Sequence, residues 1–188
     1  HVSKLIIDPN NNNVFYATTQ GATEYTDKVG DGAGVFKSTD RGNNWTQINN
    51  GLDSLETNIL TVDPNDSETL YLGTDDDGVY KSTDGGESWK KLTVSSLSKS
   101  FGVGDIIVDP QNSNNIYIGT VDYFRLSESR GVLGDFGIYK STDGGTTWEE
   151  FNSGLKHLGV FSLELSEENR ILYAGTRAGG VYWISLDD

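Results

Sequence analysis

The chain has 188 residues, of which 35% are hydrophobic, and this is enough for one sizeable core. Its net charge of −14 argues against nucleic acid or an anionic membrane surface as a partner. It has no Cys, which excludes disulfides and thiolate chemistry, and it has no apolar run long enough to span a membrane.

Short β-branched and aromatic runs recur along the chain in a constant order. In the first unit, residues 5–7 precede an Asp-Pro turn, and residues 14–18 and 34–38 follow. Equivalent runs occupy residues 60–62, 70–74 and 78–82, then 106–108, 116–120 and 137–141, then 172–176 and 180–184. Another run begins at a Trp after each of the first three units, and no segment has a helical period. We therefore predict that the repeating unit forms four antiparallel strands, which we call A to D in chain order.

The turn from strand C to strand D carries one phrase three times, at residues 38–45, 82–89 and 141–148. Its pattern is Ser-Thr-Asp-x-Gly-x-x-Trp. Gly supplies the positive φ of a tight turn, the Asp carboxylate accepts hydrogen bonds from the turn's own amides, and the Trp anchors neighbouring units. Three such carboxylates on separate units cannot converge on one substrate, so we assign the phrase a structural role. Its residues are Ser38, Asp40, Gly42, Trp45, Ser82, Asp84, Gly86, Trp89, Ser141, Asp143, Gly145 and Trp148.

The spacing of the phrase predicts an all-β propeller of four-stranded blades. The phrase Trp residues lie 44 and then 59 positions apart, and without a 13-residue excess in the B–C loop of the third unit the second spacing would be 46. The underlying period of about 45 is that of a propeller blade. We expect one domain over residues 1–188, with blades near 1–52, 53–98, 99–155 and 156–188. Since the fourth unit stops after strand C, we expect three full blades and one three-stranded blade of a partial propeller. A four-bladed ring and an eight-bladed ring of two chains are the alternatives.

The phrase and its setting resemble the Asp-box, or BNR, repeat over nearly the whole chain. Asp-box repeats are found in sialidases, two-propeller xyloglucanases, sortilin-type receptors and the photosystem II assembly factor. The resemblance implies a β-propeller whose Asp-boxes lie at the periphery, away from any active site. It leaves the function open.

The B–C loops are the candidate binding face. In a meander they lie at the opposite end of the strands from the Asp-boxes, and loops on a rigid scaffold commonly carry function. Aromatic rings beside carboxylates and Arg are typical of a carbohydrate or peptide groove. The alternative is that these are ordinary polar loops whose aromatic residues pack on the blade. The candidate ligand-binding residues are Tyr25, Asp75, Tyr123, Phe124, Arg125 and Arg177.

Asp75 is also the candidate for catalysis. The segment 74–80 is similar to the loop that carries a catalytic Asp in the two-propeller xyloglucanases, with Asp75 at the matching position. Glycoside hydrolysis needs two carboxyls, and in that family the second lies on another propeller. A sialidase is less well supported, since no sialidase motif surrounds Arg125, Arg130 or Arg177. The acidic run 75–77 lacks the spacing of a calcium loop, and neither His has a zinc-ligand partner, so we expect no metal and no cofactor.

The sequence favours a non-catalytic binding or assembly module of an exported protein, extracellular, cell-surface or periplasmic. Its expected partner is a polysaccharide or a protein, with no nucleic acid and no membrane insertion. The alternative is a fragment of a xyloglucanase-like glycosidase. The open edge of the three-stranded blade is expected to be covered by another chain, by an upstream segment or by the chain's own terminus, and self-association is the first of these alternatives.

Overall fold

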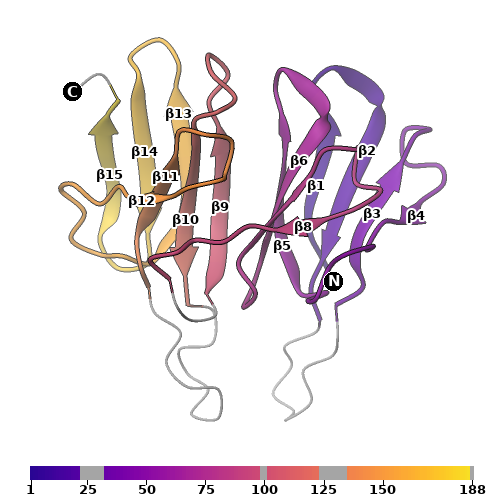
Figure 1. Ribbon diagram of the computed structural model, residues 1–188, viewed down its shortest axis with the longest axis horizontal. Helices are drawn as coiled ribbons and strands as arrows, with labels where there is room; N and C mark the ends of the chain where they lie inside the picture. Colours follow the sequence, from indigo (N-terminus) through magenta and orange to yellow (C-terminus); the bar gives the residue numbers. More distant parts are fainter. Residues whose placement is uncertain (22–31, 98–100, 123–134, 187–188) are drawn as a thin grey trace.

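The computed structural model describes residues 1–21, 32–97, 101–122 and 135–186. They form four antiparallel sheets, three of four strands and one of three, each a simple meander in chain order. The sheets stand side by side, with the first two forming the right half of Figure 1 and the last two the left half. The predicted fold class is confirmed, and we call the sheets blades 1 to 4.

The strands follow the repeat seen in the sequence. Blade 1 contains β1 (Val2–Asp8), β2 (Asn11–Thr19), β3 (Gly34–Ser38) and β4 (Thr46–Gln47). Blade 2 contains β5 (Thr57–Asp63), β6 (Asp66–Thr74), β7 (Val79–Ser82) and β8 (Lys90–Lys91). Blade 3 contains β9 (Gly102–Val108), β10 (Ile116–Val121), β11 (Ile138–Ser141) and β12 (Glu149–Glu150). Blade 4 contains β13 (Val160–Ser166), β14 (Ile171–Thr176) and β15 (Gly180–Ser185).

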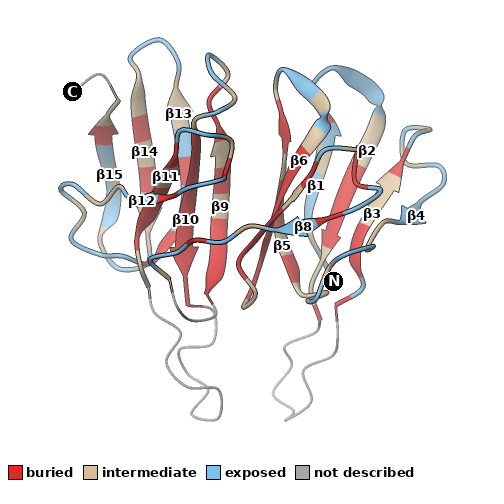
Figure 2. Cartoon of the chain, in the orientation of Figure 1, coloured by how far each residue is buried: buried red, intermediate tan, exposed pale blue. Residues whose placement is uncertain are grey.

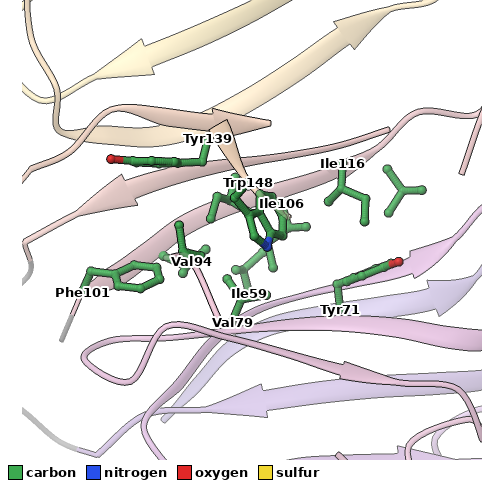
Figure 3. Packing of buried hydrophobic residues seen from close by; sticks show 12 residues of the cluster. Ile59, Tyr71, Val79, Val94, Phe101, Ile106, Ile116, Tyr139 and Trp148 are labelled. Carbon is green, nitrogen blue, oxygen red and sulfur yellow. The ribbon is translucent and has the colours of Figure 1, made fainter. Parts of the chain in front are cut away.

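The core lies between the blades, because each blade is only one sheet thick and must bury its faces on its neighbours. Three apolar clusters fill the three junctions between consecutive blades. At the junction of blades 2 and 3, Tyr71 and Val79 from one side meet Ile106, Ile116 and Trp148 from the other (Figure 3). Side chains from both sides of each junction therefore hold the blades together.

Polar contacts at the A–B turns also join the blades. Asp8 of blade 1 accepts a hydrogen bond from the Ser67 hydroxyl of blade 2 at 2.9 Å, and Asp63 repeats this with Ser113 of blade 3 at 2.7 Å. At the third junction the buried Asp109 carboxylate accepts hydrogen bonds from both terminal nitrogens of Arg170, at 3.0 and 2.6 Å. Burial works against the ionised form of Asp109, but the hydrogen bonds from Arg170, the Gln111 amide and Asn115, together with the positive charge of Arg170, outweigh it and lower its pKa. A buried Asp at the end of strand A is thus a repeated link to the next blade.

The two outermost blades each expose an apolar face. Val2, Leu5 and Ile7 of β1 are at least half exposed, although the residues at the same positions of β9 are buried where blade 2 covers them. At the other flank, Val181 and Trp183 of β15 are 72% and 65% exposed, and Figure 2 shows exposed residues along this strand. The exposed face of β1 is the one that, in later blades, packs on the preceding blade. The exposed face of β15 is the one that, in earlier blades, packs on the following blade.

Candidate functional site

The B–C end of blades 1 and 2 places Asp75 in a network of polar side chains. Asp75 follows β6 directly, is 6% exposed, and accepts a hydrogen bond from Gln20 Nε2 at 2.7 Å. Its own amide donates to the carbonyl of Glu56 at 3.0 Å. Gln20 is held in turn by its backbone amide, which donates to the His1 carbonyl at 3.0 Å, and by its side-chain amide, which donates to Asn58 Oδ1 at 3.1 Å. The carboxyl is therefore held in one position by groups from two blades.

The surroundings of Asp75 favour its protonated form. Burial is the main cause, and the nearby carboxylates of Glu56 and Asp76 add to it, while the hydrogen bond from Gln20 acts in the opposite sense. Together they raise the pKa of Asp75 to about 7. A carboxyl with this pKa can donate or accept a proton near neutral pH.

Glu56 holds the base of the first long B–C loop. Its two carboxylate oxygens accept the backbone amides of Gly21 at 2.7 Å and Gly32 at 2.8 Å, the residues that flank positions 22–31. Since both oxygens are occupied by structural bonds, the role of Glu56 is to close the loop and to place negative charge beside Asp75. The neighbouring Asp76 accepts a bond from Ser54 at 3.3 Å.

Arg177 belongs to a different part of the same end. It follows β14, donates through Nη2 to the backbone carbonyl of Asp122, and its guanidinium lies 5.2 Å from the centre of the Phe161 ring. Asp122 is buried, and its amide donates to Asp135 at 2.9 Å. The described contacts of Asp75 lie in blades 1 and 2, whereas those of Arg177 lie in blades 3 and 4, so the structure does not join these two candidates directly.

The other predicted ligand-binding residues lie outside the described part of the chain. They are Tyr25, Tyr123, Phe124 and Arg125.

Sequence reasoning missed Gln20 and Glu56. The expected strand B of the first unit, residues 14–18, placed Thr19 at the position of Asp75, but β2 extends to Thr19, whose hydroxyl donates to the Gly34 carbonyl as that of Thr74 does to Gly78, so Gln20 is the structural equivalent of Asp75. For Glu56, only the folded contact with the loop base reveals the role.

The Asp-boxes form turns at the opposite end of the strands. In blade 2, the Ser82 hydroxyl donates to Asp84 at 2.7 Å and accepts the amide of Gly86 at 2.9 Å, while Asp84 accepts the amide of Ser88 at 2.9 Å. The same bonds recur in the turns of blades 1 and 3. Hydrogen bonds from the side chain and amide of Ser88 lower the pKa of Asp84 to about 2. These carboxylates are fully used within their own turns.

The phrase Trp residues pack on the preceding blade. Trp89 donates through its indole to the carbonyl of Ile48 in blade 1, and Trp148 packs in the core between blades 2 and 3. Both are buried, as expected. Trp45, which we also expected to be buried, is 38% exposed. The physical reason is that no described blade lies on the side of blade 1 that Trp45 faces.

Metal and membrane signals are lacking in the described ranges. Residues 1–21, 32–97, 101–122 and 135–186 contain no group of three or more acidic or His side chains placed to hold a metal ion. Over the same ranges, no helix has the length and apolarity that crossing a bilayer requires.

Comparison with known proteins identifies the family. The family described as sortilin, neurotensin receptor 3 (Sortilin-Vps10) matches residues 33–181, most of the chain. This chain belongs to the sortilin–Vps10 family. The match includes all three Asp-boxes, and the expected relationship to Asp-box propellers is confirmed.

Relatives of this sortilin–Vps10 chain include glycoside hydrolases. Xyloglucanase Xgh74A of Acetivibrio thermocellus is 34% identical over 96 residues, which cover 46% of this chain and 11% of the xyloglucanase. The crystal structure of the GH74 enzyme of Niastella koreensis matches 99% of this chain and 29% of its own at 27% identity, with a TM-score of 0.71. This chain thus spans well under a third of these enzymes.

A more distant match shows the fold alone. YCF48 from Cyanidioschyzon merolae covers all of this chain, and 51% of its own, at 11% identity with a TM-score of 0.66. Another YCF48 structure is described as bound to D1 peptide. This propeller fold therefore occurs both in enzymes and in a protein whose solved structure is described as bound to a peptide.

Proposed function

We propose that this chain is a blade segment of a polysaccharide-cleaving protein and that Asp75 is one of its two reacting carboxyls. The observation that carries the proposal is the placement of Asp75, a carboxyl at the loop face that is 6% exposed, accepts a hydrogen bond from Gln20 at 2.7 Å and lies beside Glu56 and Asp76, surroundings that raise its pKa to about 7. A glycosidase needs one carboxyl that keeps its proton near neutral pH so that it can protonate the leaving oxygen. Burial beside Glu56 and Asp76 provides this property.

Other residues at this end support Asp75. Gln20 is a positioning residue, since its side-chain amide fixes the carboxyl while its backbone amide donates to the His1 carbonyl. Glu56 is occupied by the loop base and is therefore assigned an electrostatic role. The second reacting carboxyl is assigned to a part of the protein outside this segment.

The similarity to xyloglucanases supports a β-glucan as the substrate class. Identity to the GH74 relatives, at 27% to 34%, is well above that to YCF48. An extracellular, cell-surface or periplasmic location fits this proposal, because a polysaccharide is too large to cross a membrane unaided.

The test compares Asp75→Asn with the adjacent Asp76→Asn in the protein that carries this segment. Release of reducing ends from xyloglucan should fall by a factor of roughly 10³ or more in Asp75→Asn, with oligosaccharide binding kept, and should change little in Asp76→Asn. The wild-type pH–rate profile should have a limb near pH 7 that the Asp75 variant loses. Wild-type rates in Asp75→Asn would contradict the proposal.

A non-catalytic binding module is the second candidate. Membership of a family described by a receptor favours it, as does the YCF48 structure with a peptide. In that case a glycan or peptide array would detect a ligand, no hydrolysis would accompany binding, and Asp75→Asn would weaken the binding, because Asp75 is one of the candidate ligand-binding residues.

Self-association through the open blade faces completes the proposal for partners. Val181 and Trp183 offer one half of an inter-blade junction, and β1 offers the other half. Light scattering should show the 188-residue chain associating as its concentration rises, and Trp183→Glu should shift it towards monomer. A wild-type chain that stays monomeric at high concentration would contradict this.

A further inference from the structure

A groove of about 520 Å³ lies between blades 2 and 3, beside the Asp-box turns and away from Asp75. Its lining combines three lysines, several hydroxyl groups and a short apolar stretch, and the ammonium of one of these lysines, Lys91, is paired with the Asp77 carboxylate. None of the described residues that line it is acidic, although the chain has 28 Asp and Glu. The lining residues used below are Lys81, Lys90, Thr83 and Thr93.

Two lysines lie directly opposite each other in this groove. Lys81 of β7 and Lys90 of β8 are register partners, so their side chains project from the same face of the sheet. Lys81 is held in place, since its Nζ donates to the carbonyl of Gly144 at 3.0 Å and lies 5.2 Å from the centre of the Tyr71 ring. Like charges directly opposite on a sheet are destabilising unless something neutralises them.

The other full blades avoid this arrangement. In blade 1 the equivalent Lys37 faces neutral Thr46, and in blade 3 Lys140 faces the carboxylate of Glu149. Lys37 contacts the next Asp-box in the same way as Lys81, donating to the Gly85 carbonyl at 2.9 Å. The Lys on strand C is therefore common to the three four-stranded blades described. Of these blades, blade 2 has a second Lys opposite it on strand D.

We propose that this groove binds the oxyanion of a small ligand between Lys81 and Lys90. The bound group would be a carboxylate, sulfate or phosphate, which neutralises the opposed ammonium groups by charge-assisted hydrogen bonds. Lys81 acts as the fixed cation, Lys90 closes over the anion from the outer strand, and the hydroxyls of Thr83 and Thr93 border the site. The volume suits a ligand of saccharide size rather than a single ion.

This site is independent of the proposed hydrolysis. Lys81 and Lys90 belong to the Asp-box side of blade 2, and Asp75 lies at the B–C end of the same blade. Loss of activity in Asp75→Asn would not affect the groove, and loss of anion binding would not affect the pKa of Asp75.

The experiment titrates the protein with sodium sulfate, phosphate, glucuronate and glucose at constant ionic strength, with chloride as the reference salt. Amide resonances of Lys81, Lys90 and Thr83 should shift and saturate with at least one oxyanion and not with glucose or chloride. The order among the three oxyanions then identifies which group the site prefers.

Two substitutions reproduce the pairs of the other blades, and a third controls for net charge. Lys90→Thr copies blade 1 and should raise the dissociation constant for the oxyanion at least tenfold. Lys90→Glu copies blade 3 and should abolish binding while raising the melting temperature in chloride, which also shows that the variant folds. Lys156→Thr removes an exposed charge elsewhere and should leave affinity within about twofold. Equal affinity in Lys90→Thr and Lys156→Thr, or no saturable shift with any oxyanion, would overturn the proposal.

Discussion

Removing the aromatic ring of Trp148 should cost far more stability than removing that of Trp45. Both indoles donate to the carbonyl of the Gly in their own turn, at 3.1 and 3.0 Å, so the hydrogen bond is matched. The difference is packing, because Trp148 is 7% exposed between two blades and Trp45 is 38% exposed. A Trp buries up to ~250 Å², so Trp148 buries about 80 Å² more. At ~25 cal/mol per Å² this is about 2 kcal/mol.

We therefore expect Trp148→Ala to lower the free energy of unfolding by ~3–5 kcal/mol and Trp45→Ala by ~1–3 kcal/mol. Urea denaturation followed by far-ultraviolet circular dichroism measures both values, and an unchanged m-value would show that the same surface unfolds. The measurement is made at the lowest concentration that gives a signal, because association through blade 1 would bury Trp45. Equal losses in the two variants would refute the view that contact with the preceding blade determines what each Trp contributes.

Three further predictions concern polar groups. Because the pKa of Asp75 is raised, the folded chain keeps a proton that the unfolded chain loses above about pH 4. The free energy of unfolding of the wild type should therefore fall between pH 4 and pH 7, by about 4 kcal/mol at most, and urea denaturation of Asp75→Asn should not show this pH dependence. Ser82→Ala should cost ~1–3 kcal/mol in urea denaturation, because the buried amide of Gly86 loses its acceptor; a loss near zero would mean that water replaces the hydroxyl. Arg170→Ala should cost ~3–5 kcal/mol near pH 7 by leaving the buried Asp109 carboxylate without its partner, and much less at a pH low enough to protonate it; a pH-independent loss would contradict the ion-pair explanation.

The propeller architecture could be predicted from the sequence because the Asp-box phrase occurs three times in it. The Asp-box phrase, the Asp-Pro turns and the alternating apolar runs each recur with one period, so a chance match at one place does not alter the result. The strand order, the turn bonds of Ser82 and Asp84, and the three-stranded fourth blade all agree with that period.

The sequence predicted only part of the candidate site. Asp75 was singled out by its position after β6, but its pKa depends on Gln20, Glu56 and Asp76, two of which come from other strands or loops. Arg177 was placed on the same face correctly, yet its partners are the Asp122 carbonyl and the Phe161 ring, and it makes no described contact with Asp75. Which residues of a face meet depends on how far apart their blades are, and one sequence does not give that distance.

Local patterns of apolar residues, Gly, Asp and Pro are enough to specify the repeat, the strands and the turns. The surroundings of each copy of the repeat depend on the folded chain. Trp45 is exposed where Trp148 is buried, and Lys81 faces a second Lys where Lys140 faces Glu149. Burial and electrostatic interaction are properties of neighbours in space, so the same Trp of the phrase acquires a different energy in each copy, and a substitution such as Lys90 for Glu149 matters through the residue that the fold places opposite it.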